Sequence, residues 1–436
     1  MSKTLEERRA FVREALERGR QEGATAVLVN CGYDNSRSVS FSAGRLKECS
    51  RKCTEMFSIS LVAGGRMGMA AGNDWDALPS LVKRAAAFAR NGAAAHFEKY
   101  PAPAAAYPEL ELDSDSVEKL TEEVLIADCG RIVSSLRELD DGLVVDAGGN
   151  VSRGLSITAT DAGFWREEKR SLWSLGAGYQ KTTGTDMLFS GAQRAWGEWN
   201  DFYSPDRLLE ELAFDLRHGA QSVPVENGPV TLILPPEQMT LFLKPLALAI
   251  NGRNVFKGTS PLKDKLGRLC FAQNLSVYDN PHIRFSPSAC AADDCGVPTA
   301  ARHLVKEGVL ECFLYDYDTA GLAGAQPTGN IDCSPYTMLV QPGTKSHEEL
   351  LRGVARGVYV RDFLGFGQSN MTNGDFSANL ALAFWVENGE ITHRVKNAMV
   401  AGNLFELLRG EVAFSSDTHP WNRQPFGFIP NVSLKC

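Results

Sequence analysis

The chain has 436 residues, of which 44% are hydrophobic and 22% charged, as in ordinary globular proteins. It carries 45 lysines and arginines against 53 aspartates and glutamates, so its formal net charge is −8. Because phosphate backbones attract basic surfaces, this sign argues against a protein that coats nucleic acid, and we expect no direct nucleic-acid contact.

The length predicts two or three domains with a sizeable core. The longest apolar run, residues 241–250, contains Lys244 and Pro245 and is too short to cross a membrane. Residues 1–20 are typical of a charged amphipathic helix and not of a signal peptide. We therefore expect a cytoplasmic protein without membrane contact, in which the ten cysteines are reduced thiols.

Residues 1–92 are predicted to form an amino-terminal α+β domain. Thr4 and Glu7 form a capping box that starts the first helix. The apolar run 26–30 indicates a buried strand, and a polar turn at 34–37 is expected to separate it from a strand at 39–43.

Residues 93–114 are rich in alanine and proline and have no period, which predicts a linker. A central α+β domain, 115–227, follows. It opens with a second capping box at Asp115 and Glu118 and closes with a helix over about 205–219.

Residues 228–436 are predicted to be a larger, strand-rich domain. Pro235 and Pro236 start a helix after its first strand, and Ser346 and Glu349 cap another. A hairpin turn is expected at 388–389, where Asn precedes Gly. The predicted fold class is α+β, with helix-plus-antiparallel-sheet units at the amino terminus and a strand-rich carboxyl-terminal domain.

The residues predict neither a catalytic residue nor a metal ligand. His347 and Glu348 start a helical zinc motif, but no histidine follows one turn later. Asp293 and Asp294 precede Gly296 and could bind a metal, although a tight polar turn is the favoured interpretation.

Two loops of small residues have two interpretations. Each could receive an extended peptide by strand addition, or could be a turn packed against its own sheet. The residues concerned are Thr328, Gly329 and Asn330 in one loop, and Thr372, Asn373, Gly374 and Phe376 in the other.

Several segments of the third region carry a resemblance to a known family. GPVTLILPPEQMTLFL, KGTSPLKDKLG, DDCGVPT, MTNGDFS and FWVENGEITHRVKNAMVAGN occur in this order between residues 228 and 403. Together they resemble the TldD/PmbA family, whose members are known as modulators of DNA gyrase and as metallopeptidases.

The resemblance also implies which branch the chain is similar to. In the TldD branch, a helix after the first strand of this region carries His-Glu-x-x-x-His, and a cysteine near the carboxyl end completes a zinc site. The corresponding helix here, at about 241–251, has no His and no Glu, and contains Pro245. The chain therefore resembles the PmbA (TldE) branch, with no cofactor of its own and zinc only in a partner subunit.

The implied function is a non-catalytic, peptide-binding subunit of a heterodimeric cytoplasmic metalloprotease that acts on unfolded or flexible peptides. Its expected partner is a TldD-like, zinc-bearing subunit, or a second copy in a homodimer. One alternative is an independently active metallopeptidase with a divergent metal site, and another is a regulator of DNA gyrase or of toxin–antitoxin proteins. Candidates for the divergent site are Asp293, Asp294, Cys290 and His282.

Overall fold

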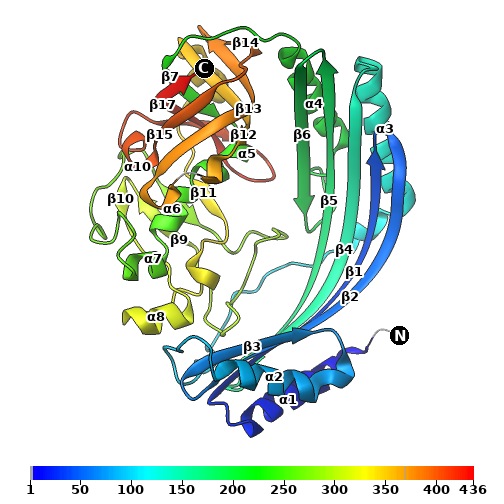
Figure 1. Cartoon of the computed structure of the whole chain (residues 1–436), viewed down its shortest axis with the longest axis vertical. Coiled ribbons are helices and arrows are strands. Elements are labelled where there is room, and N and C mark those ends of the chain that lie inside the picture. The colour runs from blue at the N-terminus through cyan, green and yellow to red at the C-terminus, as the bar shows by residue number, and fades with distance from the viewer. Residues whose placement is uncertain (1–2, 369) are drawn as a thin grey trace.

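The structure is a computed structural model that describes residues 3–368 and 370–436. A long six-stranded antiparallel sheet and a strand-rich carboxyl-terminal region face each other (Figure 1). Helices and antiparallel sheets are mixed along the chain, so the predicted α+β class is confirmed. Within the two described ranges, no helix has both the length and the apolar character needed to cross a membrane.

The first helix begins where its cap predicts. α1 (Leu5–Gln21) has Thr4 as its N-cap, and Thr4 and Glu7 form the reciprocal capping box. Three strands follow: β1 (Ala26–Ser42), β2 (Arg45–Ala63) and β3 (Arg66–Gly72). After a short 3₁₀ turn η1 (Trp75–Ala77), α2 (Leu78–Ala89) packs on β2 and β3.

The turn predicted at 34–37 is wrong, because these residues continue β1. Asp34 lies opposite Thr54 of β2 on one side and opposite Gly154 of β4 on the other. Since β1 pairs on both edges, ladder hydrogen bonds satisfy its backbone even where its side chains are polar.

One sheet joins the two regions that the sequence suggests as separate domains. Its strand order is β3-β2-β1-β4-β5-β6, with β4 (Val144–Thr160), β5 (Trp165–Thr183) and β6 (Asp186–Trp196). β1 and β4 pair from Leu28 opposite Thr160 to Phe41 opposite Ala147. Residues 1–92 and 115–227 therefore share a sheet, and their independence as folding units stays a prediction.

Two helices of the central region pack on this sheet around the buried Trp173. α4 (Pro205–Gly219) agrees with its predicted range. α3 (Glu122–Leu139) starts after Thr121, which caps it, and not at the predicted capping box. Residues Asp115–Lys119 instead form the 3₁₀ turn η2.

The segment predicted as a linker is tied to three parts of the protein. The Ala95 amide donates to Gly65 O at 2.9 Å, the Ser171 amide donates to Leu112 O at 3.0 Å, and the Phe285 amide donates to Glu111 O at 2.9 Å. The side chains of Tyr100 and Leu112 are buried. This segment therefore contributes to packing between the sheet and the carboxyl-terminal region.

The carboxyl-terminal region contains a ring of strands. β12 pairs with β13 and closes the path β12-β7-β17-β15-β13. The ring consists of β7 (Gly228–Leu234), β12 (Arg356–Leu364), β13 (Asp375–Glu387), β15 (Met399–Asn403) and β17 (Pro425–Lys435), with β14 (Glu390–Arg394) on β13 and β16 (Ala413–Thr418) on β17. The β13–β14 hairpin turns at Asn388 and Gly389, both with positive φ, as predicted.

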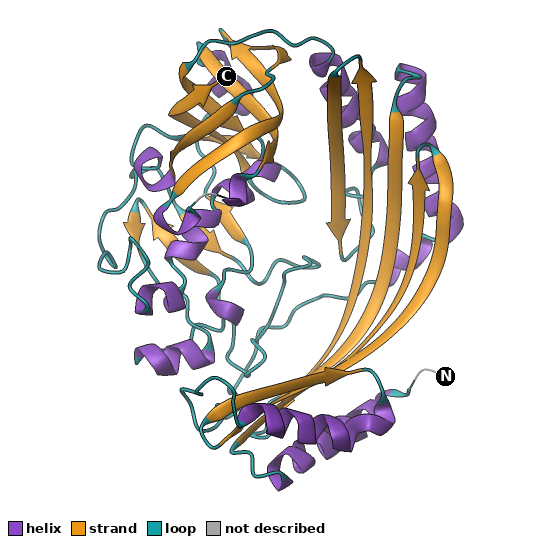
Figure 2. Ribbon diagram, viewed as in Figure 1, coloured by secondary structure: helices purple, strands orange, loops and turns teal. Residues whose placement is uncertain are grey.

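A smaller sheet and several short helices lie below the ring in the view of Figure 2. The sheet consists of β8 (Val277–Asp279), β9 (Arg302–Lys306), β10 (Val309–Leu310) and β11 (Met338–Val340). The helices are α5 (Pro236–Phe242), α6 (Lys244–Ala249), α7 (Gly252–Phe256), α8 (Tyr317–Ala323), α9 (His347–Arg352) and α10 (Leu404–Leu407), with 3₁₀ turns η3 (Ile331–Cys333), η4 (Phe366–Gln368) and η5 (Met371–Asn373). The predicted Ser346–Glu349 box caps α9.

The close approach of α2 to β3 depends on Gly68. A Cβ on Gly68 would overlap the carbonyl oxygen of Ala85 and the amide nitrogen of Ala89, whereas a Cβ on Gly72 of the same strand would meet Leu81 Cδ1 at an ordinary 3.5 Å. We predict that Gly68→Ala lowers the free energy of unfolding by about 2 kcal/mol, because α2 must move away from the sheet. Urea denaturation of both variants checks this, and an equal effect of the control Gly72→Ala would contradict it.

Candidate functional site

A cavity of about 520 Å³ lies between the edge strand β6, helix α4 and the carboxyl-terminal region. Polar and charged side chains from distant parts of the chain converge on it. Its charged lining consists of Arg194, Glu211, Glu237 and Arg361. Cavities of this size that carry a few convergent polar groups are the usual form of ligand-binding sites.

Helix α5 places Glu237 in the cavity wall. Pro235 and Pro236 set the backbone of the first turn directly after β7, as predicted, and Glu237 follows within that turn. The side-chain amide of Gln238 donates from Nε2 to Arg361 O at 2.8 Å, which ties α5 to β12. The carboxylate of Glu237 is thus held at the start of a short, braced helix.

Helix α4 contributes two carboxylates on one face, one turn apart. The Glu211 carboxylate pairs with Arg194 of β6 and, at 3.6 Å, with Arg361 of β12. The Asp215 carboxylate accepts from Arg361 Nε at 2.9 Å and from the Ser190 hydroxyl at 2.7 Å. Since Asp215 is 1% exposed and Arg361 is 11% exposed at the side chain, this is a buried charge network.

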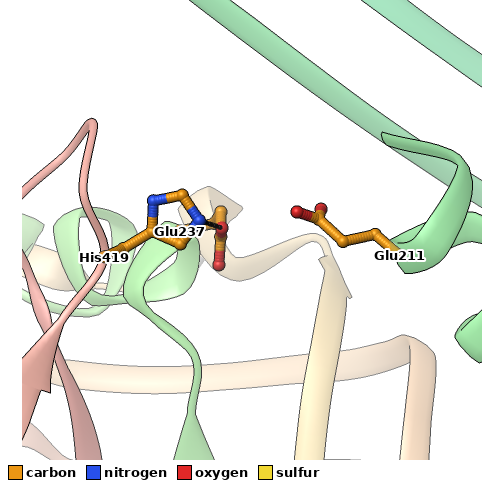
Figure 3. Close-up of side chains that lie close together, drawn as sticks. All are labelled: Glu211, Glu237 and His419. Carbon is orange, nitrogen blue, oxygen red and sulfur yellow. Dashed lines mark ion pairs between the residues drawn. The ribbon is translucent and has the colours of Figure 1, made fainter. Parts of the chain in front are cut away.

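The loop between β16 and β17 brings His419 to the same place. The His419 amide donates to Gln424 O at 2.9 Å, and the side chain of the buried Gln424 donates to Met338 O at 2.6 Å. His419 Nε2 then lies 3.7 Å from Glu237 Oε1. Figure 3 shows His419 beside Glu237, with the Glu211 carboxylate directed toward them from α4.

Burial controls the protonation of this cluster. Burial raises the pKa of Glu211 and that of Asp215, and the nearby arginines Arg194 and Arg361 oppose this shift. Burial lowers the pKa of His419 to about 4, although Glu237 opposes the change. His419 is therefore neutral at pH 7, while the two guanidinium groups remain charged.

The cluster can be tested as a metal site. One ligand atom each from Glu211, Glu237 and His419 lie within 4.8 Å of one another, and these donor types can bind zinc. However, Glu211 is already neutralised by Arg194 and Arg361, and these cations would repel a divalent ion. The surroundings of the three side chains therefore do not fit a zinc ion.

The segment expected to correspond to the zinc-binding helix of the TldD branch, residues 241–251, is interrupted. α5 ends at Phe242, and α6 begins at Lys244 with Pro245 in its first turn, so residues 241–251 do not form one regular helix. The sequence reasoning missed Glu237, which lies four residues before that range. The proline pair that starts α5 directly after β7 is the signal that could have indicated it.

The first predicted peptide loop, with Thr328, Gly329 and Asn330, is packed within its own domain. The Thr328 hydroxyl accepts from the Tyr315 backbone amide at 2.9 Å. The buried side chain of Asn330 donates from Nδ2 to the Asp279 carboxylate at 2.9 Å. Gly329 has φ 73°, and a Cβ there would overlap Pro298 O. These contacts are those of a turn packed against its own sheet, and peptide binding by this loop stays a prediction.

The second predicted loop is also engaged internally. The backbone oxygen of Asn373 accepts from Nδ2 of the Asn403 side chain at 2.9 Å. Gly374 adopts φ 85° beside the ring of Phe405. Phe376 is 1% exposed and its ring lies 5.7 Å from that of Phe242. Thr372, at the end of this loop, is half-buried, and peptide contact at these residues stays a prediction.

Three of the four residues considered for a divergent site, Cys290, Asp293 and Asp294, lie near Arg166 of β5. Arg166 pairs with Asp294 at 3.4 Å and donates to Cys290 Sγ at 3.8 Å. Asp293 accepts from the Val297 amide at 2.8 Å, and burial raises its pKa to about 6. With Gly296 at φ 93°, this is the tight polar turn that the sequence favours.

His282 is held apart from these acids by a different contact. Its Nε2 lies 2.9 Å from the Thr299 hydroxyl, which in turn donates to Cys290 O at 2.5 Å. Burial lowers the pKa of His282. The described residues show no group of three or more potential metal ligands here, whereas they do show one at 211, 237 and 419.

Comparison with known proteins identifies relatives of this chain. Residues 227–434 match the PmbA/TldA metallopeptidase C-terminal domain. The chain is 29% identical over 53% of its length to a metalloprotease PmbA homolog from Buchnera aphidicola subsp. Acyrthosiphon pisum. It is 27% identical over 71% of its length to a PmbA homolog from Haemophilus influenzae. The matched stretches span 51% of the Buchnera protein, or about half, and 68% of the Haemophilus protein.

Solved structures share the fold over nearly the whole chain. A proposed modulator of a DNA gyrase from Thermotoga maritima MSB8 has a TM-score of 0.87 at 22% identity, covering 98% of this chain and 100% of that one. TldE from Thermococcus kodakarensis has a TM-score of 0.84 at 20% identity, again covering 98% of this chain and 100% of that one. At these identities the likeness concerns the fold alone.

We predict that Arg361→Met destabilises the protein by about 3 kcal/mol, because it leaves the buried Asp215 carboxylate without its cation. Adding Asp215→Asn should recover most of this loss. The exposed pair Arg352–Glu348 provides the control, and Arg352→Met should cost below about 0.5 kcal/mol. Chemical denaturation measures all three variants, and a mild effect of Arg361→Met would contradict the buried-charge argument.

We also predict a pH dependence that His419 causes. The native pKa of about 4 lies below the ordinary 6.5, so His419 contributes stability that is full above pH 6.5 and is lost as the pH falls toward 4. Between these values, His419→Gln should reduce the slope of unfolding free energy against pH by up to about 1.4 kcal/mol per pH unit. The exposed His303→Gln serves as the control. An unchanged slope in His419→Gln would show that His419 is not buried in its neutral form.

Proposed function

Because the chain belongs to the TldD/PmbA family, a family of metalloproteases, we propose that it is the peptide-binding, metal-free subunit of a two-subunit cytoplasmic metalloprotease. Its partner in this proposal is a TldD-like subunit that carries the zinc ion. The substrates are unfolded or flexible peptides. A homodimer of this chain is the alternative assembly.

One observation carries the proposal. The place where a metal would be expected, after the first strand of the carboxyl-terminal region, holds Glu237 and a neutral His419, and the neighbouring Glu211 is paired with two arginines. A zinc ion that activates water needs three protein ligands and an open position. The guanidinium groups of Arg194 and Arg361 supply positive charge where that ion would supply it.

The cavity supports a role in binding peptides. Besides its charged groups, it is lined by hydroxyl and amide side chains that can pair with a peptide backbone: Gln193, Thr240, Ser286, Ser288, Thr337 and Asn422. Since peptide amides need such partners once they leave water, this lining suits a chain of variable sequence.

The cluster of Glu211, Glu237 and His419 favours one second candidate, an independently active metallopeptidase with a divergent site. In that case Glu211 would have to exchange its two arginine partners for a metal ion. We consider the subunit proposal stronger, since breaking both ion pairs leaves the buried Arg194 guanidinium without its carboxylate and Arg361 with Asp215 alone.

We predict that the purified chain contains well under one equivalent of zinc and does not cleave casein or flexible peptides. Mixed with a TldD-like subunit from the same organism, it should form a stable complex that cleaves them. Elemental analysis and a peptidase assay measure both properties, and the partner subunit alone is the control.

Stoichiometric metal together with chelator-sensitive cleavage by the isolated chain would overturn the proposal. The double variant Glu211→Gln and Glu237→Gln would then locate that metal, since it should lose the ion if the cluster binds it. Failure of the two chains to form a complex would count against the heterodimer specifically.

A further inference from the structure

Among the described residues, Glu237 has no lysine or arginine within ion-pair distance. Its single ion-pair contact within the described residues is His419 at 3.7 Å, which is longer than a hydrogen bond. His419 is neutral at pH 7, because burial lowers its pKa to about 4. The Glu237 side chain is 25% exposed and lines the cavity. The negative charge of Glu237 therefore faces the cavity uncompensated.

The charge around the cavity fits a single positive charge. Three carboxylates, those of Glu211, Asp215 and Glu237, lie in the network with two guanidinium groups, those of Arg194 and Arg361. One negative charge remains when His419 is neutral. Arg207 also influences His419, but Arg207 is exposed on α4 and its charge is screened by solvent.

The spacing of the acceptors admits an ammonium group, and the charge of the two guanidinium groups, rather than this spacing, disfavours a zinc ion. An ammonium nitrogen lies about 2.9 Å from each acceptor, so tetrahedrally placed acceptors lie about 4.7 Å apart. Zinc bonds of about 2.1 Å would require ligands about 3.4 Å apart. The oxygens of Glu211 and Glu237 and the ring nitrogen of His419 lie within 4.8 Å of one another, with 3.7 Å between Glu237 and His419.

The indole ring of Trp421 also lines the cavity. The indole Nε1 of Trp421 is buried and makes no hydrogen bond to any described residue, although Trp421 lines the cavity. Arg194 lies over the Trp421 ring at 5.5 Å and holds it in place. Because this nitrogen is buried, a ligand in the cavity contacts the indole ring and not its N–H.

We propose that this cavity binds the primary ammonium group of a peptide, either its amino terminus or a lysine side chain. Glu237 and Glu211 accept two of the ammonium hydrogen bonds, and His419 Nε2 accepts the third. The rest of the peptide lies along the hydroxyl and amide side chains of the cavity. The identity of the ligand as a peptide rests on the proposed function, whereas the ammonium site itself rests on the geometry.

The first experiment uses a small probe that does not depend on peptide binding. Butylammonium chloride should raise the melting temperature of the full chain more than sodium chloride at the same ionic strength. Glu237→Gln should abolish this difference. Glu348→Gln, at an exposed glutamate of α9, should preserve it. Because the Glu237 side chain makes no hydrogen bond to the residues that the structure describes, its variant is expected to fold, and circular dichroism checks this.

The second experiment uses short, carboxyl-terminally labelled peptides of glycine, serine and alanine. A free amino terminus should bind about tenfold more tightly than an acetylated one, since the charge-assisted contact is lost on acetylation. Glu237→Gln should remove this preference and Glu348→Gln should keep it. An acetylated peptide with one lysine distinguishes the sources: affinity gained from the lysine shows that the side chain can fill the site, and no gain assigns the site to the terminus alone.

The outcomes separate the two proposals. Equal affinity of the wild-type chain for the free peptide, the acetylated peptide and the acetylated peptide with one lysine would overturn the ammonium site and leave peptide binding intact. A preference that persists in Glu237→Gln would also overturn it, because the amine would then bind elsewhere. No peptide binding, together with a Glu237-dependent butylammonium effect, would support the site and contradict the peptide function. No effect of butylammonium and no peptide binding would overturn both.

Discussion

The buried guanidinium of Arg361 joins the long sheet to the carboxyl-terminal ring. It extends from β12 to Asp215 and Glu211 on α4, which packs on the edge strand β6. A buried arginine must keep its carboxylates, since either partner alone in the interior is costly. This requirement fixes the distance between the two halves, and the cavity with Glu237 exists at that distance.

Local signals explain why part of the fold is predictable. The capping boxes at Thr4 and Ser346, and the proline that starts α4, act within one helical turn, so the chain needs no distant partner to express them. The predicted turn at 34–37 failed for the opposite reason. Its polar residues suit a turn, but their backbone pairs with β2 and with β4, which lies more than 100 residues away in sequence.

Local sequence patterns could not predict the candidate site, because its residues are far apart in sequence. Glu211, Glu237 and His419 come from α4, α5 and the β16–β17 loop, and no spacing rule connects them. Each alone resembles an ordinary surface residue. Their chemistry becomes visible once Arg194 and Arg361 are seen to neutralise Glu211 and not Glu237. Burial of His419 then leaves one carboxylate of the cluster without a counter-charge.

The position of β17 in the ring has a consequence for biosynthesis. β17 (Pro425–Lys435) lies between β7 and β15, so the earliest strand of the ring gains its antiparallel neighbour from the last strand of the ring to be translated. Domains synthesised first generally fold first. On the ribosome, the six-stranded sheet can therefore assemble while the ring is still open, with β7 and β15 presenting unpaired edges. Until β17 emerges, these edges are the part of the nascent protein most in need of protection by chaperones.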